Sequence, residues 1–148
     1  MTDLDIAKAN LKGHSICLCR DGEIITDDGR GISPMMRFIN EGRDLSGYSV
    51  ADVIVGKAAA MLFVKAGIAE VYGKVISTAG RDHLIRHNIP CSWDTLTENI
   101  INCNGDDICP MEKTVAEIID AEEGYEALKE KLLVLSKVKN DPTEAIQP

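Results

Sequence analysis

The pattern of apolar and polar positions predicts a helix and then a β-hairpin at the start of the chain. Apolar residues near the N-terminus follow helical spacing up to Gly13, which can end the helix. Residues 15–20 are apolar on both faces, as expected of a strand that is covered on both sides. Asp21-Gly22 is a strong hairpin-turn signal, and residues 23–26 form the returning strand.

The centre of the chain holds its longest apolar stretch. Residues 53–64 are apolar except for Lys57 and are too few to cross a membrane, which takes about 20 residues. The preceding Ser49-Val50-Ala51-Asp52 resembles a helix capping box, and Gly67 is a typical C-terminal stop. These signals predict one buried helix over residues 50–66, at the centre of the domain.

Strands and helices alternate in the rest of the chain. Residues 68–76 are rich in β-branched and aromatic residues and predict a strand, and residues 89–93 predict another. Ser77 or Thr78 is expected to cap the helix between them. The order of elements predicts an α/β fold, a three-layer sandwich in which a mixed β-sheet has helices on both faces. Further helices are expected after a cap at Ser33, after a cap at Asp94 or Thr95, over residues 110–119 and over residues 121–137.

Length, charge and cysteine usage narrow the classes of function. The 148 residues suit a single domain over residues 1–139, followed by a polar tail over residues 140–148. The net charge of −8 repels phosphate backbones and anionic lipid, so neither nucleic acid nor a membrane is an expected partner. The acidic N-terminus is unlike a signal peptide, and an odd number of cysteines is typical of reduced thiols, so a cytoplasmic location is expected.

Three residues are candidates for catalysis: Cys109, Glu112 and Lys57. Cys109 precedes Pro110 and is either an N-cap thiol activated by the helix dipole or a buried packing thiol. Glu112, at the third helical position, can close a capping box or act as a catalytic base. Lys57 either reaches water or a structural ion pair, or is a cleft lysine that binds an anionic ligand or acts as a base. The remaining cysteines are expected to be packing thiols: Cys17, Cys19, Cys91 and Cys103.

A second group of residues is predicted to bind a ligand. Ser77 and Thr78 follow the C-terminal end of a predicted strand, where α/β sheets bind ligands, although either also suits a plain helix cap. Arg30 lies in a flexible loop and is either an anion clamp or a solvated side chain. The group comprises Arg30, Gly31, Gly56, Ser77 and Thr78.

Several segments together resemble a known family. They are Gly31-Ile32-Ser33-Pro34, Ser49-Val50-Ala51-Asp52 running into Val55-Gly56-Lys57-Ala58-Ala59-Ala60, Val71-Tyr72-Gly73-Lys74-Val75-Ile76-Ser77, and Cys109-Pro110-Met111-Glu112-Lys113. Over residues 4–131 the chain resembles the domain-of-unknown-function 1893 family of bacteria and archaea, whose structural type is a hypothetical Thermotoga protein. The resemblance implies a cytidine-deaminase-like fold and no established reaction. It also implies that Lys57 and residues 109–112 approach each other across one cleft.

The zinc-binding motifs of the deaminases are not matched in this sequence. Those enzymes place a His or Cys ligand two residues before a Glu at one helix start, and Pro-Cys-x-x-Cys at another. Here Val55-Gly56-Lys57 offers no ligand, and Cys109-Pro110-Met111-Glu112 offers a single thiol. Neither a metal nor another cofactor is therefore expected.

Three functions remain open at this stage. The first is a ligand-binding protein or enzyme of deaminase-like fold without zinc, with a small anionic or nucleobase-like metabolite held near Cys109, Glu112 and Lys57. The second is a thiol-based sulfur carrier that uses Cys109. The third is a non-catalytic scaffold, for which a homo-oligomer is one arrangement. The sequence leaves open whether the protein is an enzyme.

Overall fold

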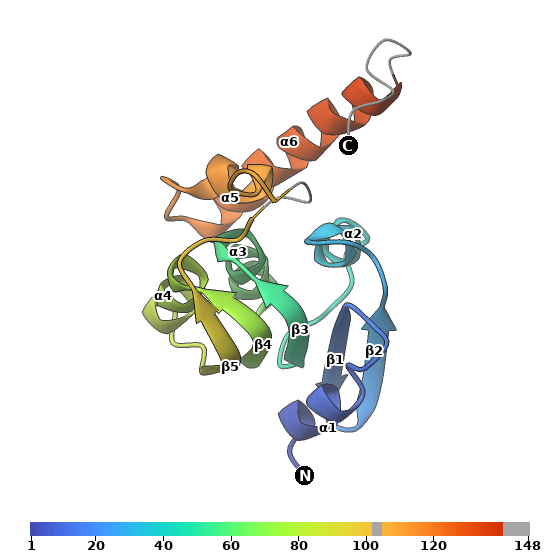
Figure 1. Ribbon diagram of the computed structural model, residues 1–148. Coiled ribbons are helices and arrows are strands. Elements are labelled where there is room, and N and C mark those ends of the chain that lie inside the picture. The colour runs from blue at the N-terminus through green and yellow to red at the C-terminus, as the bar shows by residue number, and fades with distance from the viewer. Residues whose placement is uncertain (102–104, 141–148) are drawn as a thin grey trace.

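A five-stranded mixed sheet forms the centre of the molecule. The structure is a computed structural model that describes residues 1–101 and 105–140, except for the side chains of residues 136–140. The strand order is β2-β1-β3-β4-β5 (Figure 1). β1 is antiparallel to both β2 and β3, whereas β3, β4 and β5 are parallel, so the predicted mixed sheet is confirmed. The strands are β1 (Ile16–Arg20), β2 (Glu23–Asp27), β3 (Ser49–Val55), β4 (Glu70–Ser77) and β5 (Cys91–Thr97).

The predicted hairpin between β1 and β2 is confirmed. Asp21 and Gly22 both have positive φ angles, of 52° and 81°, as a two-residue hairpin turn requires. The backbone at Gly22 strains no side chain, because glycine has no Cβ. The turn fixes the register in which Arg20 pairs with Glu23.

Helices pack on both faces of the sheet. α1 (Asp3–Ala9) covers one face, where Leu4 and Ala7 contact Cys17 and Tyr72. The main core lies on the other face, where apolar side chains such as Leu18 and Val50 contact the remaining helices. In Figure 1, α6 continues away from the sheet beyond α5. The other helices are α2 (Ser33–Asn40), α3 (Lys57–Ala66), α4 (Thr78–Arg86), α5 (Pro110–Val115) and α6 (Ala121–Asn140).

The prediction of one helix over residues 50–66 is wrong in its first part. Residues Ser49–Val55 form strand β3, and the helix begins only at Lys57. The strand is rich in β-branched residues, which favour a pleated surface buried on both sides. Ser49 and Asp52 are therefore interior strand residues and cap no helix. Gly67 ends α3 in the left-handed conformation, φ 76°, as predicted.

The helix predicted after Asp94 or Thr95 is also wrong, because β5 continues through both residues to Thr97. Leu96 is 41% exposed and Ile101 is 51% exposed, so neither packs into the core. β5 is an edge strand, and its large apolar side chains Trp93 and Leu96 are exposed. Ile101 instead pairs with Ile108 in an isolated β-bridge.

Smaller differences affect the helix ends. Ser33 is the first residue of α2 rather than its cap, and its hydroxyl donates a hydrogen bond to the Arg30 carbonyl oxygen at 2.8 Å. α5 ends at Val115, earlier than predicted, whereas the predicted cap of α4 at Ser77 is confirmed. Cys103 and residues 141–148 lie outside the described residues. Within the described part of the chain, no helix is long and apolar enough to cross a membrane.

Candidate functional site

The carboxylate of Glu112 caps the N-terminus of a different helix from its own. Oε1 accepts a hydrogen bond from the backbone N–H of Lys57 at 2.7 Å, and Oε2 accepts one from the N–H of Ala58 at 2.8 Å. These are the first two N–H groups of α3, which have no partner within the helix. The negative charge also lies at the positive end of the helix dipole. The local capping box predicted for Glu112 is therefore wrong, because its side chain binds residues far away in the sequence.

Gly56 makes room for this contact. It is the N-cap of α3 and contributes no side-chain hydrogen bond. A Cβ atom at this position would lie 2.4 Å from Oε1 of Glu112, far inside van der Waals contact. Gly80 in α4 is crowded in the same way, since its Cβ would lie 2.9 Å from the carbonyl carbon of Gly56. The two glycines allow α3, α4 and α5 to converge at the carboxyl end of β3.

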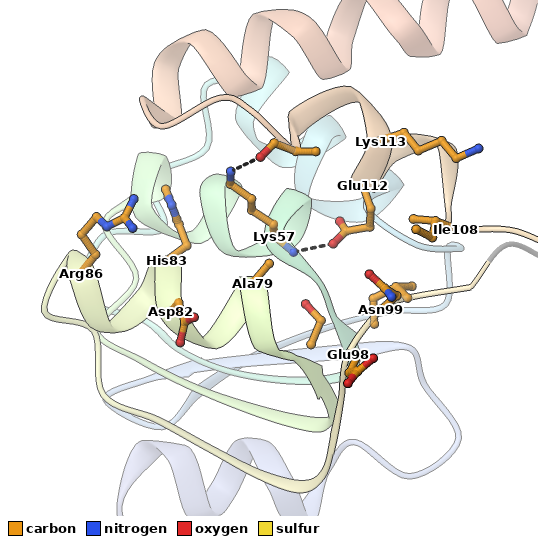
Figure 2. Close-up of a pocket in the computed structure, with 13 residues that line it drawn as sticks. Lys57, Ala79, Asp82, His83, Arg86, Glu98, Asn99, Ile108, Glu112 and Lys113 are labelled. Carbon is orange, nitrogen blue, oxygen red and sulfur yellow. Dashed lines mark hydrogen bonds between the residues drawn. The ribbon is translucent and has the colours of Figure 1, made fainter.

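Lys57 has two separate contacts at this junction (Figure 2). Its backbone N–H binds Glu112, whereas its ammonium Nζ donates a hydrogen bond to the Ala116 carbonyl oxygen at 3.0 Å. Within the described residues the ammonium forms no ion pair, and the charges of Glu117 and Glu112 act on it only through space. Burial lowers the pKa of Lys57, and the nearby charge of Arg86 lowers it further.

The pKa of Glu112 is shifted in the opposite direction. Burial raises the pKa of this carboxyl group above its usual range. The hydrogen bonds from Ala58 and Lys57 counteract part of that shift, because they stabilise the charged form. Glu112 is thus a desolvated carboxylate whose charge is offset mainly by backbone N–H groups.

Two cavities meet at Glu112. The larger has a volume of about 730 Å³ and lies between the loop before α2, the second half of β3, the first turn of α3 and the start of α5. The smaller, of about 340 Å³, lies between α3, α4, the segment after β5 and α5. Figure 2 shows the smaller cavity. Glu112 and Ile100 line both.

The structure divides the predicted site residues between these cavities. Of the three predicted catalytic residues, Cys109 lines only the larger cavity, Lys57 lines only the smaller one, and Glu112 lines both. Thr78 lines neither, and its hydroxyl donates a hydrogen bond to the Thr97 carbonyl oxygen. The predicted ligand-binding residues Arg30, Gly31 and Gly56 line the larger cavity, and Ser77 lines the smaller.

Cys109 is the N-cap of α5, as predicted, but its thiol makes no capping hydrogen bond. Its backbone N–H donates to the Ile100 carbonyl oxygen at 2.8 Å, which ties the start of α5 to the segment after β5. Cys17 and Cys19 are buried in the sheet, and burial raises the pKa of both thiols. A nucleophilic role for Cys109 stays a prediction.

Asp52 is a site residue that the sequence reasoning missed. Only 8% of it is exposed, and it lies on the wall of the larger cavity. Burial raises the pKa of its carboxyl group to about 8, against weaker opposing hydrogen bonds from the N–H groups of Ile54 and Val53. The group is therefore mostly protonated at neutral pH. An acidic residue among β-branched neighbours was the available signal, and it was interpreted as a helix cap.

Comparison with known proteins places the chain in a family. The family described as a domain of unknown function, DUF1893, matches residues 7–132. The chain belongs to the DUF1893 family. A crystal structure of a DUF1893 family protein from Thermotoga maritima is 26% identical, with a TM-score of 0.77, and the match covers 93% of this chain and 91% of that one. No curated protein matches the chain.

Membership of DUF1893 assigns the fold but no reaction. The cavities and the Glu112 contact therefore have to be interpreted by their own chemistry. Across the described residues, no cluster of three or more His, Cys, Asp or Glu side chains is arranged to hold a metal ion.

The contact between Gly56 and Glu112 predicts a coupled loss of stability. Glu112→Ala leaves two helix N–H groups unpaired, and Gly56→Ala pushes the carboxylate away, so each is expected to cost about 2 kcal/mol. Because both changes break the same contact, the double variant should cost at least about 1 kcal/mol less than the sum of the two. Urea unfolding measures all three values. Glu117→Ala, at an exposed position after α5, is the matched control, and its cost in stability should add to that of Gly56→Ala. Full additivity of the costs of Gly56→Ala and Glu112→Ala would contradict the contact.

The buried Asp52 predicts an unusual dependence of stability on pH. Between the ordinary Asp pKa of 3.8 and the native value of about 8, the folded protein holds a proton that the unfolded chain has lost. This contribution to stability is fully present below pH 3.8 and declines as pH rises towards 8, by at most about 1.4 kcal/mol per pH unit. Asp52→Asn should therefore gain stability over the wild type across this range.

Unfolding of the wild type and of Asp52→Asn at several pH values measures the difference in their stability. Asp44→Asn is a control of opposite sign, because hydrogen bonds from Ser46 lower the pKa of Asp44. A gap between wild type and Asp52→Asn that is the same at all pH values would contradict a raised pKa of Asp52.

Proposed function

We propose that this DUF1893 protein binds a small heterocyclic metabolite of nucleobase type in the larger cavity, anchored by the carboxyl group of Asp52. The observation that carries the proposal is a buried carboxyl group on the wall of a cavity of about 730 Å³. Cavities of roughly 300–1,000 Å³ are typical of small-molecule sites. This one lies beside the carboxyl end of β3, where α/β sheets bind ligands.

The walls of the cavity suit a flat ring. Val53, Ile54, Ile100 and Met111 supply apolar surface from three separate segments of the chain. Gly56 and its neighbours in the first turn of α3 form a wall without large side chains. An apolar slot with few polar groups is the usual arrangement of a site that recognises a ring by its edge.

Asp52 supplies the polar edge. A protonated carboxyl group has one O–H donor next to one carbonyl acceptor. This pair is complementary to the adjacent donor and acceptor on an amide or amidine edge of a heterocycle. Hydrogen bonds made in such a water-poor site are stronger than the same bonds in water. Because the pKa of Asp52 is about 8, the donor form predominates at neutral pH.

Arg30 extends the range of ligands at the edge of the cavity. It is exposed and lines the cavity from the loop before α2. Its guanidinium would contact an anionic substituent on the heterocycle, such as a phosphate. The nucleobase-like and anionic parts of one metabolite would thus lie at the Asp52 end and the Arg30 end, respectively.

The proposal is limited to binding. A cytidine-deaminase-like fold would be consistent with a nucleobase-like ligand, and it remains an inference from resemblance. Catalysis by Cys109, Glu112 or Lys57 stays a prediction. Cys109 lines the same cavity, so a sulfur-carrier role also stays a prediction, for which a persulfide mass shift on Cys109 is the direct measurement.

Calorimetric titration with adenine, cytosine, uracil and their nucleosides and nucleoside monophosphates tests the proposal. At least one base should bind, with an affinity that falls about tenfold per pH unit above the pKa of Asp52. Asp52→Asn keeps a donor and an acceptor of the same shape, so it should retain binding and lose the pH dependence. Asp52→Leu should weaken binding by about tenfold or more.

Two further variants separate the parts of the site. Arg30→Gln should weaken binding of the monophosphate and leave binding of the free base unchanged. Asp82→Asn, which alters the smaller cavity only, is the matched control and should change neither. If no base, nucleoside or nucleotide binds, or if Asp52→Leu binds as well as the wild type, the proposed function is wrong.

A further inference from the structure

His83 is buried on the wall of the smaller cavity without any hydrogen-bond partner. It is 2% exposed, and neither Nδ1 nor Nε2 bonds to a described residue. The ring approaches that of His87, with 4.5 Å between centroids, but the two rings share no hydrogen bond. Native proteins rarely leave a buried polar group in this condition, because each lost hydrogen bond costs about 1–3 kcal/mol.

The surroundings of His83 are cationic. Burial lowers the pKa of His83 to about 4, and the charges of His87, Lys57 and Arg86 contribute further. Lys57 and Arg86 line the same cavity as His83. In Figure 2 the side chains of Arg86, His83 and Lys57 follow one another along one side of the cavity. The side chain of Arg86 makes no hydrogen bond or ion pair within residues 1–101 and 105–140. The neutral imidazole therefore lies in a cavity that two cationic side chains also line.

The acidic groups of the cavity are engaged or distant. Asp82 pairs with Arg81, and Glu112 binds the N–H groups at the start of α3. Glu98 lies at the other end of the cavity from His83 and Arg86 in Figure 2. Glu117 acts on Lys57 only through its charge. The acidic residue that lines the His83 end of the cavity, Asp82, is thus already paired with Arg81.

We infer that the smaller cavity binds a small oxyanion, a phosphate or carboxylate group, between Lys57, His83 and Arg86. The neutral imidazole donates one N–H to the anion. Arg86 supplies the planar donor pair that matches two oxygens of a phosphate or carboxylate, and Lys57 supplies a point charge with protons not used by Ala116. A volume of about 340 Å³ admits such a group with a few further atoms.

This site is separate from the one proposed for the heterocycle. Asp52 and Arg30 do not line the smaller cavity, and His83 and Arg86 do not line the larger. The oxyanion site can therefore exist even if no heterocycle binds. Glu112, which caps α3, and Ile100 line both cavities.

Titration with inorganic phosphate and, separately, with acetate tests the inference by calorimetry and by ¹⁵N-detected spectra of the histidine rings. We expect saturable binding of at least one anion, with a shift of the His83 ring nitrogens because one tautomer becomes fixed. Arg86→Gln should weaken binding about tenfold or more, and so should Lys57→Met. The relative affinity for the two anions identifies the oxyanion class.

Lys74→Gln is the control for loss of one positive charge, because Lys74 is exposed and lines neither cavity. It should leave anion binding within about twofold of the wild type. Arg86 is exposed, so its replacement leaves the core intact and keeps the test valid if a His83 variant fails to fold. An absence of saturable binding, equal weakening by Lys74→Gln, or His83 signals that do not move on addition of anion would each overturn the inference.

Discussion

The hydrogen bonds from the start of α3 to the Glu112 carboxylate are the constraint on which the candidate site depends. They join the strand-to-helix turn after β3 to a short helix that follows much later in the sequence. A six-residue helix such as α5 has little stability of its own and needs tertiary contacts to form. Glu112 provides a polar contact, and Met111 and Val115 anchor the same helix in the core. The absence of a side chain at Gly56 is what allows the carboxylate to approach.

The same junction shapes both cavities. Residues of α5 line both cavities, Glu112 is common to the two, and each cavity is lined by different residues from the first turn of α3. Each cavity contains one buried ionisable group that burial keeps neutral, Asp52 in the larger and His83 in the smaller. Neutral forms of this kind are suited to recognition, since each offers a donor and an acceptor without the cost of a buried charge.

Local signals in the sequence predicted much of the fold, whereas contacts between residues far apart in the sequence were missed. The hairpin turn, the stop at Gly67 and the cap at Ser77 depend on neighbouring residues and are confirmed. The boundary between β3 and α3 at Gly56 was missed because a short apolar run is compatible with either a buried strand or a buried helix. The partner of Glu112 was missed for a different reason, since a capping box and a remote cap have the same local sequence. The same holds for the site residues. The proximity of Lys57 and Glu112 was expected from the family resemblance. Asp52 was not recognised as a site residue because residues 50–66 were predicted to form one helix.

Hydrogen exchange of the backbone amides of Lys57 and Ala58 tests the central contact most directly. If Glu112 holds these two N–H groups, both should exchange as slowly as amides inside α3, although the first N–H groups of a helix normally exchange fast. In Glu112→Ala they should lose protection while the amides of β4 keep theirs. Fast exchange of Lys57 and Ala58 in the wild-type protein, or unchanged protection in Glu112→Ala, would contradict the account.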